Sequence, residues 1–144
     1  MEEDLNQLGE DLVTTSARFV RWVRTDTFTV SLASARILAR LSDIGPSRVS
    51  DLALLERSSQ PTITNHIKRL EAAQLVARSA DATDARASVI ALTEHGHRRL
   101  AEMRHAMGSS VAPQLSALSA GDLEALRQGI DIMRRLMAAD RVSR

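Results

Sequence analysis

Residues 58–76, SSQPTITNHIKRLEAAQLV, combine an apolar and a polar helical face in one short stretch. Ile63, Ile67 and Leu70 follow the i, i+4, i+7 spacing of a helix that buries one side. The other side carries amides, hydroxyls and cations, and it includes the only lysine of the chain, Lys68. The stretch therefore predicts a helix that is anchored on one face and presents a polar surface on the other.

The sequence around this helix predicts two further helices. Ser59 is a suitable N-cap for it, and Pro61 fits the first turn, where its missing N–H costs no hydrogen bond. The preceding run SRVSDLALLE predicts a short helix over about residues 49–56. Ser31 is expected to cap an earlier helix that ends at the DIGPS turn and whose apolar stripe comprises Leu32, Ala35, Leu38 and Leu41.

After Leu75 the spacing of apolar residues changes from helical to strand-like. VARS and ASVIAL are two short runs with the composition of strands, and the ADATDAR segment between them is rich in turn formers. Together they predict a β-hairpin.

Amphipathic helices are expected at both ends of the chain. The first covers about residues 4–24, with Leu5, Leu8, Leu12 and Phe19 on one face, and TDTFTV then interrupts the pattern. Thr93 is expected to cap a helix that begins EHGHRRLAEM and reaches past Pro113 with a kink or a break there. Ser119 followed by Asp122 resembles a capping box, and it opens a last helix with an apolar side of Leu123, Leu126, Ile130, Met133 and Met137.

This order of elements predicts a mainly α fold with a small β-hairpin wing. Residues 1–144 are expected to form one domain, in which about residues 31–93 make a winged helix-turn-helix. The terminal helices, about residues 4–24 and 94–139, present more apolar surface than this small centre can cover, so a second copy is the simplest partner. The expected dimerisation residues are Leu5, Leu8, Leu12, Leu123, Leu126, Ile130 and Met133.

Composition excludes several kinds of protein. The chain has no cysteine, which rules out disulfides and thiolate chemistry. No apolar run approaches the roughly 18 residues of a membrane span, and the acidic start MEEDLNQLGEDL is unlike a signal peptide, so a cytoplasmic protein is expected. No glycine-rich phosphate loop and no Ser-His-acid pattern is present, so we expect neither an enzyme nor a cofactor.

The polar face of the 58–76 helix is typical of a surface that binds the DNA major groove. Short amides and hydroxyls near a helix N-terminus can reach base edges, while cations a turn or more later can reach phosphates. In the predicted hairpin turn, an arginine follows an acidic residue and suits a minor groove. The alternatives are a solvated helix face and a surface ion pair. The candidate DNA-binding residues are Ser59, Gln60, Pro61, Thr62, Thr64, Asn65, Lys68, Arg69, Asp84 and Arg86.

A set of short motifs between about residues 49 and 96 carries a family resemblance. They are Pro61-Thr62, Leu70-Glu71, Leu75-Val76 with Arg78, Asp84 with Arg86, and Leu92-Thr93 with Gly96. In this spacing they resemble the MarR family (multiple antibiotic resistance regulators) of bacterial winged-helix repressors. The resemblance implies a homodimer that binds a double-stranded DNA operator. Two positions depart from the family pattern, because Ala85 replaces a wing arginine and Ala82 replaces the usual wing proline.

The resemblance also implies response to a small aromatic or phenolic compound. Arg18, Trp22 and His66 are the candidate pocket residues, although Trp22 also suits a core position and His66 suits a partly buried, hydrogen-bonded one. Two other functions stay open, a dimeric protein-interaction module without DNA binding and a metal-sensing regulator. The candidate metal ligands are Glu94, His95, His97, Glu102 and His105, but their spacing matches no closed site, so no metal is expected.

Overall fold

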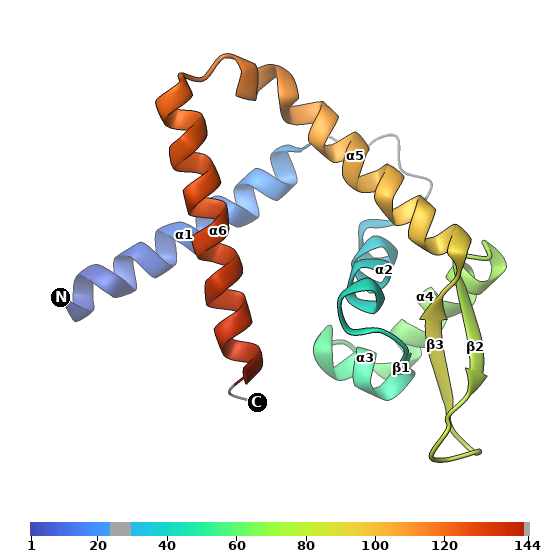
Figure 1. Cartoon of the computed structure of the whole chain (residues 1–144). Coiled ribbons are helices and arrows are strands. Elements are labelled where there is room, and N and C mark those ends of the chain that lie inside the picture. Colours follow the sequence, from blue (N-terminus) through green and yellow to red (C-terminus); the bar gives the residue numbers. More distant parts are fainter. Residues whose placement is uncertain (24–29, 143–144) are drawn as a thin grey trace. The chain divides into compact units, whose positions relative to one another are not determined.

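The computed structural model describes residues 1–23 and 30–142 and confirms the predicted order of elements (Figure 1). The predicted end of the first helix at Arg24 and most of the TDTFTV interruption lie outside the described residues. The elements are α1 (Glu2–Trp22), α2 (Leu32–Ile44), β1 (Ser47–Arg48), α3 (Val49–Leu55), α4 (Gln60–Ala72), β2 (Val76–Ala80), β3 (Ser88–Leu92), α5 (Glu94–Ser116) and α6 (Ala120–Val142).

The chain divides into two compact units. Residues 24–107 form the central unit, with α2, α3, α4, the sheet and most of α5, while residues 1–23 and 108–144 form the terminal unit. The core of the central unit contains the predicted apolar face of α4, since Ile63, Ile67 and Leu70 are at most 2 % exposed. The other core side chains come from α2, α3, the sheet and α5, and include Ile37, Leu38, Leu41, Leu52, Leu75, Val76, Ile90 and Leu100. One buried cluster thus holds α4 in a fixed rotation about its own axis.

The buried face of α2 differs from the predicted one. Leu32 is exposed and Ala35 is half-buried, while the buried positions are Ser34, Ile37, Leu38 and Leu41. A serine can occupy this core face because its Oγ lies 3.1 Å from the Nδ1 of His66 and accepts a hydrogen bond from Ser31. The spacing of apolar residues does not reveal a buried serine whose hydrogen bonds are satisfied, so it assigned the wrong face of α2 to the core. The prediction that Leu32 belongs to the buried stripe was therefore wrong.

Polar caps fix the starts of the helices as predicted. The Ser31 hydroxyl accepts the Ser34 N–H at 3.1 Å at the start of α2. At the start of α4, the Ser59 hydroxyl accepts the Thr62 N–H at 3.3 Å.

The helices α3 and α4 both end in a residue with a left-handed backbone. Arg57 has a φ of 50° and Gln74 a φ of 58°. In each case the N–H of the next residue donates a hydrogen bond to a carbonyl in the last turn of the helix. The Ser58 N–H donates to the Ala53 carbonyl at 2.9 Å, and the N–H of residue 75 donates to the Leu70 carbonyl at 2.9 Å. This is the hydrogen-bond pattern of a Schellman motif, in which glycine is the usual left-handed residue and a side chain costs roughly 1–2 kcal/mol.

The predicted hairpin is part of a three-stranded antiparallel sheet in the order β1-β3-β2. The two strand-like runs form this hairpin, in which Val76 pairs with Leu92 and Ala80 with Ser88. The strand β1 was not predicted, because two residues are too few to show an alternating pattern. It pairs Arg48 with Val89 and thereby places the Arg48 side chain beside the hairpin.

The start of α5 is locked to the end of α4. The Thr93 hydroxyl accepts the Gly96 N–H at 2.9 Å, which confirms the predicted cap, and donates to the Gln74 carbonyl at 2.6 Å. A Cβ added to Gly96 would lie 2.0 Å from the Leu75 carbonyl oxygen, which already accepts the Thr93 N–H at 3.1 Å. Because that oxygen belongs to the backbone, only glycine fits at residue 96.

The C-terminal part of the chain follows the predictions. The helix α5 reaches past Pro113 to Ser116 as predicted, but without the break that was one of the two expected alternatives. The missing N–H of the proline removes only one helical hydrogen bond. The last helix is capped as predicted, since the Ser119 hydroxyl accepts the Asp122 N–H at 3.0 Å.

The helices of the terminal unit carry uncovered apolar side chains. Of the expected dimerisation residues, Leu123 and Met133 are half-buried in the single chain, and the exposed ones are Leu5, Leu8, Leu12, Leu126 and Ile130. The described part of the chain contains no helix long and apolar enough to cross a membrane.

We predict that Gly96→Ala strongly destabilises the protein, because its methyl group would overlap the Leu75 carbonyl oxygen. The expected loss is about 3 kcal/mol in the free energy of unfolding, measured by chemical denaturation. Gly108→Ala is the matched control in the same helix, where a Cβ would meet no heavy atom within 4 Å. It should raise stability by about 0.5–1 kcal/mol, and equal effects of the two changes would contradict the packing argument.

Candidate nucleic-acid interface

The candidate residues of α4 lie together on the side opposite its buried face. Thr64 is half-buried on the flank, and the exposed residues are Ser59, Gln60, Pro61, Thr62, Asn65, Lys68 and Arg69. The first turn presents hydroxyls and amides, and the second half presents the two cations. The Ser59 and Thr62 hydroxyls lie 2.8 Å apart, so the cap also orders the side chains at the start of this surface.

Cations without a protein partner gather around α4. Among the described residues of the central unit, only Arg57, Lys68, Arg69 and Arg104 form neither an ion pair nor a side-chain hydrogen bond. Lys68 and Arg69 lie on the exposed side of α4, and Arg57 lies in the turn that precedes it. These three positive charges are therefore available to a negatively charged partner.

Carboxylates neutralise the cations that support the fold. Glu56, whose side chain is 6 % exposed, accepts hydrogen bonds from Arg36 at 2.9 Å and Arg40 at 3.0 Å and ties the end of α3 to α2. Glu71 pairs with Arg78 at 3.2 Å and joins α4 to β2. The central unit thus separates structural arginines from the unpaired cations around α4.

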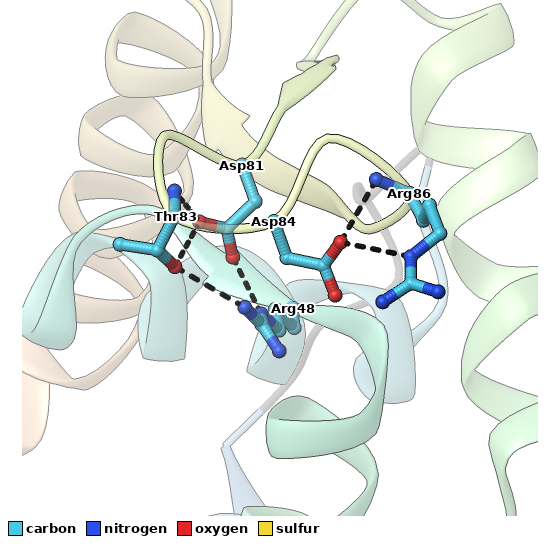
Figure 2. A network of polar contacts seen from close by, with 5 residues as sticks. All are labelled: Arg48, Asp81, Thr83, Asp84 and Arg86. Carbon is cyan, nitrogen blue, oxygen red and sulfur yellow. Dashed lines mark hydrogen bonds and ion pairs between the residues drawn. The ribbon is translucent and has the colours of Figure 1, made fainter.

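The turn of the hairpin, which we call the wing (residues 81–87), carries Arg86 near its end. The Arg86 side chain is 94 % exposed, and Asp84 accepts both its N–H at 3.0 Å and its Nε–H at 3.4 Å (Figure 2). Asp84 thus orients Arg86. It does not pair with Arg78, whose side chain donates hydrogen bonds to Glu71 and Ser88.

A second network holds the base of the wing to β1. One Asp81 oxygen accepts the N–H and the hydroxyl of Thr83 at 2.8 and 2.9 Å, and the other accepts the Nε–H of Arg48 (Figure 2). Hydrogen bonds from Thr83 and Arg48 lower the pKa of Asp81 from 3.8 to about 2. The hydrogen bond to Asp81 in turn raises the pKa of Arg48. We call Arg48, Asp81 and Thr83 the wing clasp.

Sequence reasoning missed both the wing clasp and Arg57. Asp81 and Thr83 have the spacing of a side chain that caps its own turn, which is a signal for the turn alone. The partner Arg48 lies 33 positions earlier, and only the pairing of β1 with β3 brings it close.

The candidate effector residues fall into different units. His66 is partly buried with its Nδ1 3.1 Å from the Ser34 hydroxyl, which confirms the predicted hydrogen-bonded histidine. Arg18 and Trp22 belong to α1 in the terminal unit, where the Trp22 ring lies 5.6 Å from that of Phe19. A hollow of about 200 Å³ adjoins His66 and is lined by Ala33, Arg36, Ile37, Glu56, Arg57, Ser58, Thr62 and Ile63.

The candidate metal ligands at the start of α5 do not come together. Glu94 pairs with Arg98 at 3.4 Å and Glu102 with Arg99 at 2.8 Å. Within residues 1–23 and 30–142, no three histidine or acidic side chains are grouped as a metal site would require.

Comparisons with known proteins agree with this geometry. The sequence model of the MarR family matches residues 30–88, from just before α2 to the first residue of β3. The chain is 38 % identical over 88 residues to the HTH-type transcriptional repressor NicR of Pseudomonas putida, over 61 % of this chain and 52 % of NicR. The match therefore spans about half the length of that relative.

Solved structures share the fold. A MarR family protein from Bacillus stearothermophilus has a TM-score of 0.74 at 21 % identity, covering 96 % of this chain and 98 % of that one. Wild-type MarR of E. coli without ligand has a TM-score of 0.71 at 16 % identity, covering 88 % and 96 %. These likenesses confirm the predicted mainly α, winged-helix fold.

We predict that Asp81→Asn loosens the wing, since the amide keeps the shape of the side chain but not the charge that holds Arg48. The pKa of Asp81 is lowered from its ordinary value of 3.8 to about 2. The ionised carboxylate therefore stabilises the fold fully at pH values above 3.8, and this stabilisation is lost as the pH falls through 2. In the parent chain, the protection of the residue 81–87 amides, measured against the exchange rate of an unfolded peptide at the same pH, should hold down to about pH 4 and fall below it.

In the Asp81→Asn variant the same amides should have low protection already at neutral pH, with no further loss of protection in that acid range. Carbon NMR of the Asp81 carboxyl group in the parent chain gives the direct check. Titration of Asp81 at its ordinary pKa, or full protection of these amides in the variant, would contradict the wing clasp.

Proposed function

We propose that the chain, whose residues 30–88 match the MarR family of transcriptional regulators, is a repressor that binds a pseudo-palindromic operator as a homodimer. The prediction that it is not an enzyme agrees with the family. The observation that carries the proposal is the surface of α4, where exposed amides and hydroxyls adjoin cations that no carboxylate neutralises.

The face of α4 suits insertion of its N-terminal end into the major groove. Thr62 and Asn65 are exposed and short, and such side chains can hydrogen-bond base edges. Lys68 and Arg69 follow one turn later, where the helix lies further from the base edges. Their long, positively charged side chains can there contact the phosphate backbone. Binding would therefore combine base recognition from one end of the helix with charge neutralisation from the other.

The wing suits the adjacent minor groove. Arg86 is held by Asp84 with its guanidinium in solvent, and a narrow A·T-rich groove attracts arginine through its concentrated negative potential. The wing has one arginine fewer than the family pattern and lacks its proline. The wing clasp supports the proposal because its hydrogen bonds fix the turn that a proline would otherwise stiffen.

Dimerisation is proposed from the terminal helices. Leu5 and Leu8 of α1 are more than 60 % exposed in the single chain, and Leu126 and Ile130 of α6 are at least 40 % exposed. Apolar helix faces of this kind are normally covered by a partner, and a second copy of the chain supplies a matching face. Two copies would carry two α4 helices to one duplex.

The proposal includes release of DNA by a small aromatic compound. Its support is the hollow of about 200 Å³ beside His66, which combines the apolar side chains Ile37 and Ile63 with two arginines. A ligand there would adjoin Thr62 on α4 and so compete with DNA.

The test of the proposed function is selection of bound sites from a random DNA pool, with sedimentation of the free protein. We predict a dimer at micromolar concentration and a selected site with two-fold symmetry, whose half-sites lie about 10 bp apart. Random duplex should also bind at low salt. A protein that dimerises but binds no duplex would instead be a protein-interaction module, and an asymmetric selected site would contradict the homodimer.

A second prediction separates base recognition from phosphate contact. Thr62→Ala and Asn65→Ala should reduce discrimination between operator and mutated operator, by about 1–3 kcal/mol for each good base contact. Lys68→Ala, Arg69→Ala and Arg86→Ala should weaken operator and random duplex by similar factors, because phosphate and minor-groove contacts carry little base code. Binding isotherms at two salt concentrations measure both effects.

The control is the melting temperature of each variant, which should stay near that of the parent because all five side chains are exposed. If the five substitutions lower specific and random binding alike, the assignment of roles along α4 is wrong.

A further inference from the structure

Arg57 occupies a backbone conformation that its side chain disfavours. It is the left-handed residue of the Schellman motif that ends α3, with a φ of 50°, at the position where glycine is usual. Residues outside the preferred backbone regions persist where the surrounding structure holds them, and they cluster at functional sites. A glycine would close the same turn without strain, so the presence of a side chain requires an explanation.

The fold makes no use of the Arg57 guanidinium. The side chain is exposed, and within the described residues it forms no ion pair and no hydrogen bond. The nearest candidate carboxylate in sequence, Glu56, is already bonded to Arg36 and Arg40. Arg57 therefore adds a free positive charge and nothing that the core requires.

The surroundings of Arg57 offer a place for an anion. Arg57 lines the hollow of about 200 Å³ together with Arg36 and the residues Ser58 and Thr62. The hollow thus has two guanidiniums and two hydroxyl-bearing side chains on its wall, and its one carboxylate, Glu56, is neutralised. Thr62 is also an exposed residue of the proposed DNA-binding face of α4, so a duplex on that face would pass beside the hollow.

We propose that Arg57, with Ser58 and Thr62 beside it, forms a binding site for a backbone phosphate of DNA at the entrance to α4. This inference rests on the proposed function and extends it. The phosphate contact would hold the duplex at the N-terminal end of α4, while Lys68 and Arg69 hold it at the other. The strained turn keeps an arginine because glycine would remove this contact.

The experiment compares two changes with the same backbone effect. Arg57→Gly and Gln74→Gly both relieve a left-handed residue in a Schellman motif, but only the first removes a cation. We expect melting temperatures at least as high as that of the parent for both. Arg57→Gly should lower affinity for a random duplex by roughly 10-fold, while Gln74→Gly should leave it unchanged.

The salt dependence gives an independent measure. Arg57→Gly should reduce the slope of log affinity against log salt by about 0.9 for each phosphate that is no longer bound, hence by about 1.8 for a homodimer. Arg57→Asn is the second variant, since asparagine tolerates the left-handed backbone but is neutral, and it should repeat the loss even if the glycine variant folds poorly. Unchanged affinity and slope in a folded Arg57 variant, or an equal loss in Gln74→Gly, would overturn the inference.

The outcomes separate the two proposals. A parent chain that binds no duplex at low salt would refute the proposed function and this site with it. A parent chain that binds duplex as tightly as its Arg57 variants do would refute this site alone.

Discussion

Burial of Ile63, Ile67 and Leu70 in the core of the central unit determines what α4 can present to a partner. Each of these side chains is at most 2 % exposed, and burial of such a residue contributes about 1.5–3 kcal/mol. A rotation of α4 about its axis would expose them, so the helix has one stable setting. In that setting Thr62, Asn65 and Lys68 face outward. The surface that α4 presents is therefore a consequence of how the core is packed.

The distribution of carboxylates has a comparable effect on charge. Glu56 and Glu71 lie at junctions between elements and pair with arginines that the fold needs in place. The exposed face of α4 contains no acidic residue between Gln60 and Arg69, so its cations keep their full attraction for phosphate. A chain with a formal net charge of only +1 can in this way present a strongly positive local surface.

The sequence predicted features that depend on neighbours along the chain. The caps Ser59 and Thr93 and the apolar spacing of α4 are local signals, and the structure confirms them. Contacts between distant segments were not predictable, and the pairing of Arg48 with Asp81 across 33 positions is the clearest case. The buried face of α2 was misassigned because Ser34 is satisfied by a residue from another helix. Left-handed Arg57 carries no sequence signal, since glycine is what a turn pattern leads one to expect.

The exposed face of α4 and the wing together form the surface that we propose contacts DNA. Amide NMR shifts of the parent chain, recorded while a random duplex is added at low salt, test this assignment residue by residue. We expect the largest changes on residues 59–69 and 81–87, with few changes in α6. Changes confined to α1 and α6, with α4 and the wing unaffected, would contradict it.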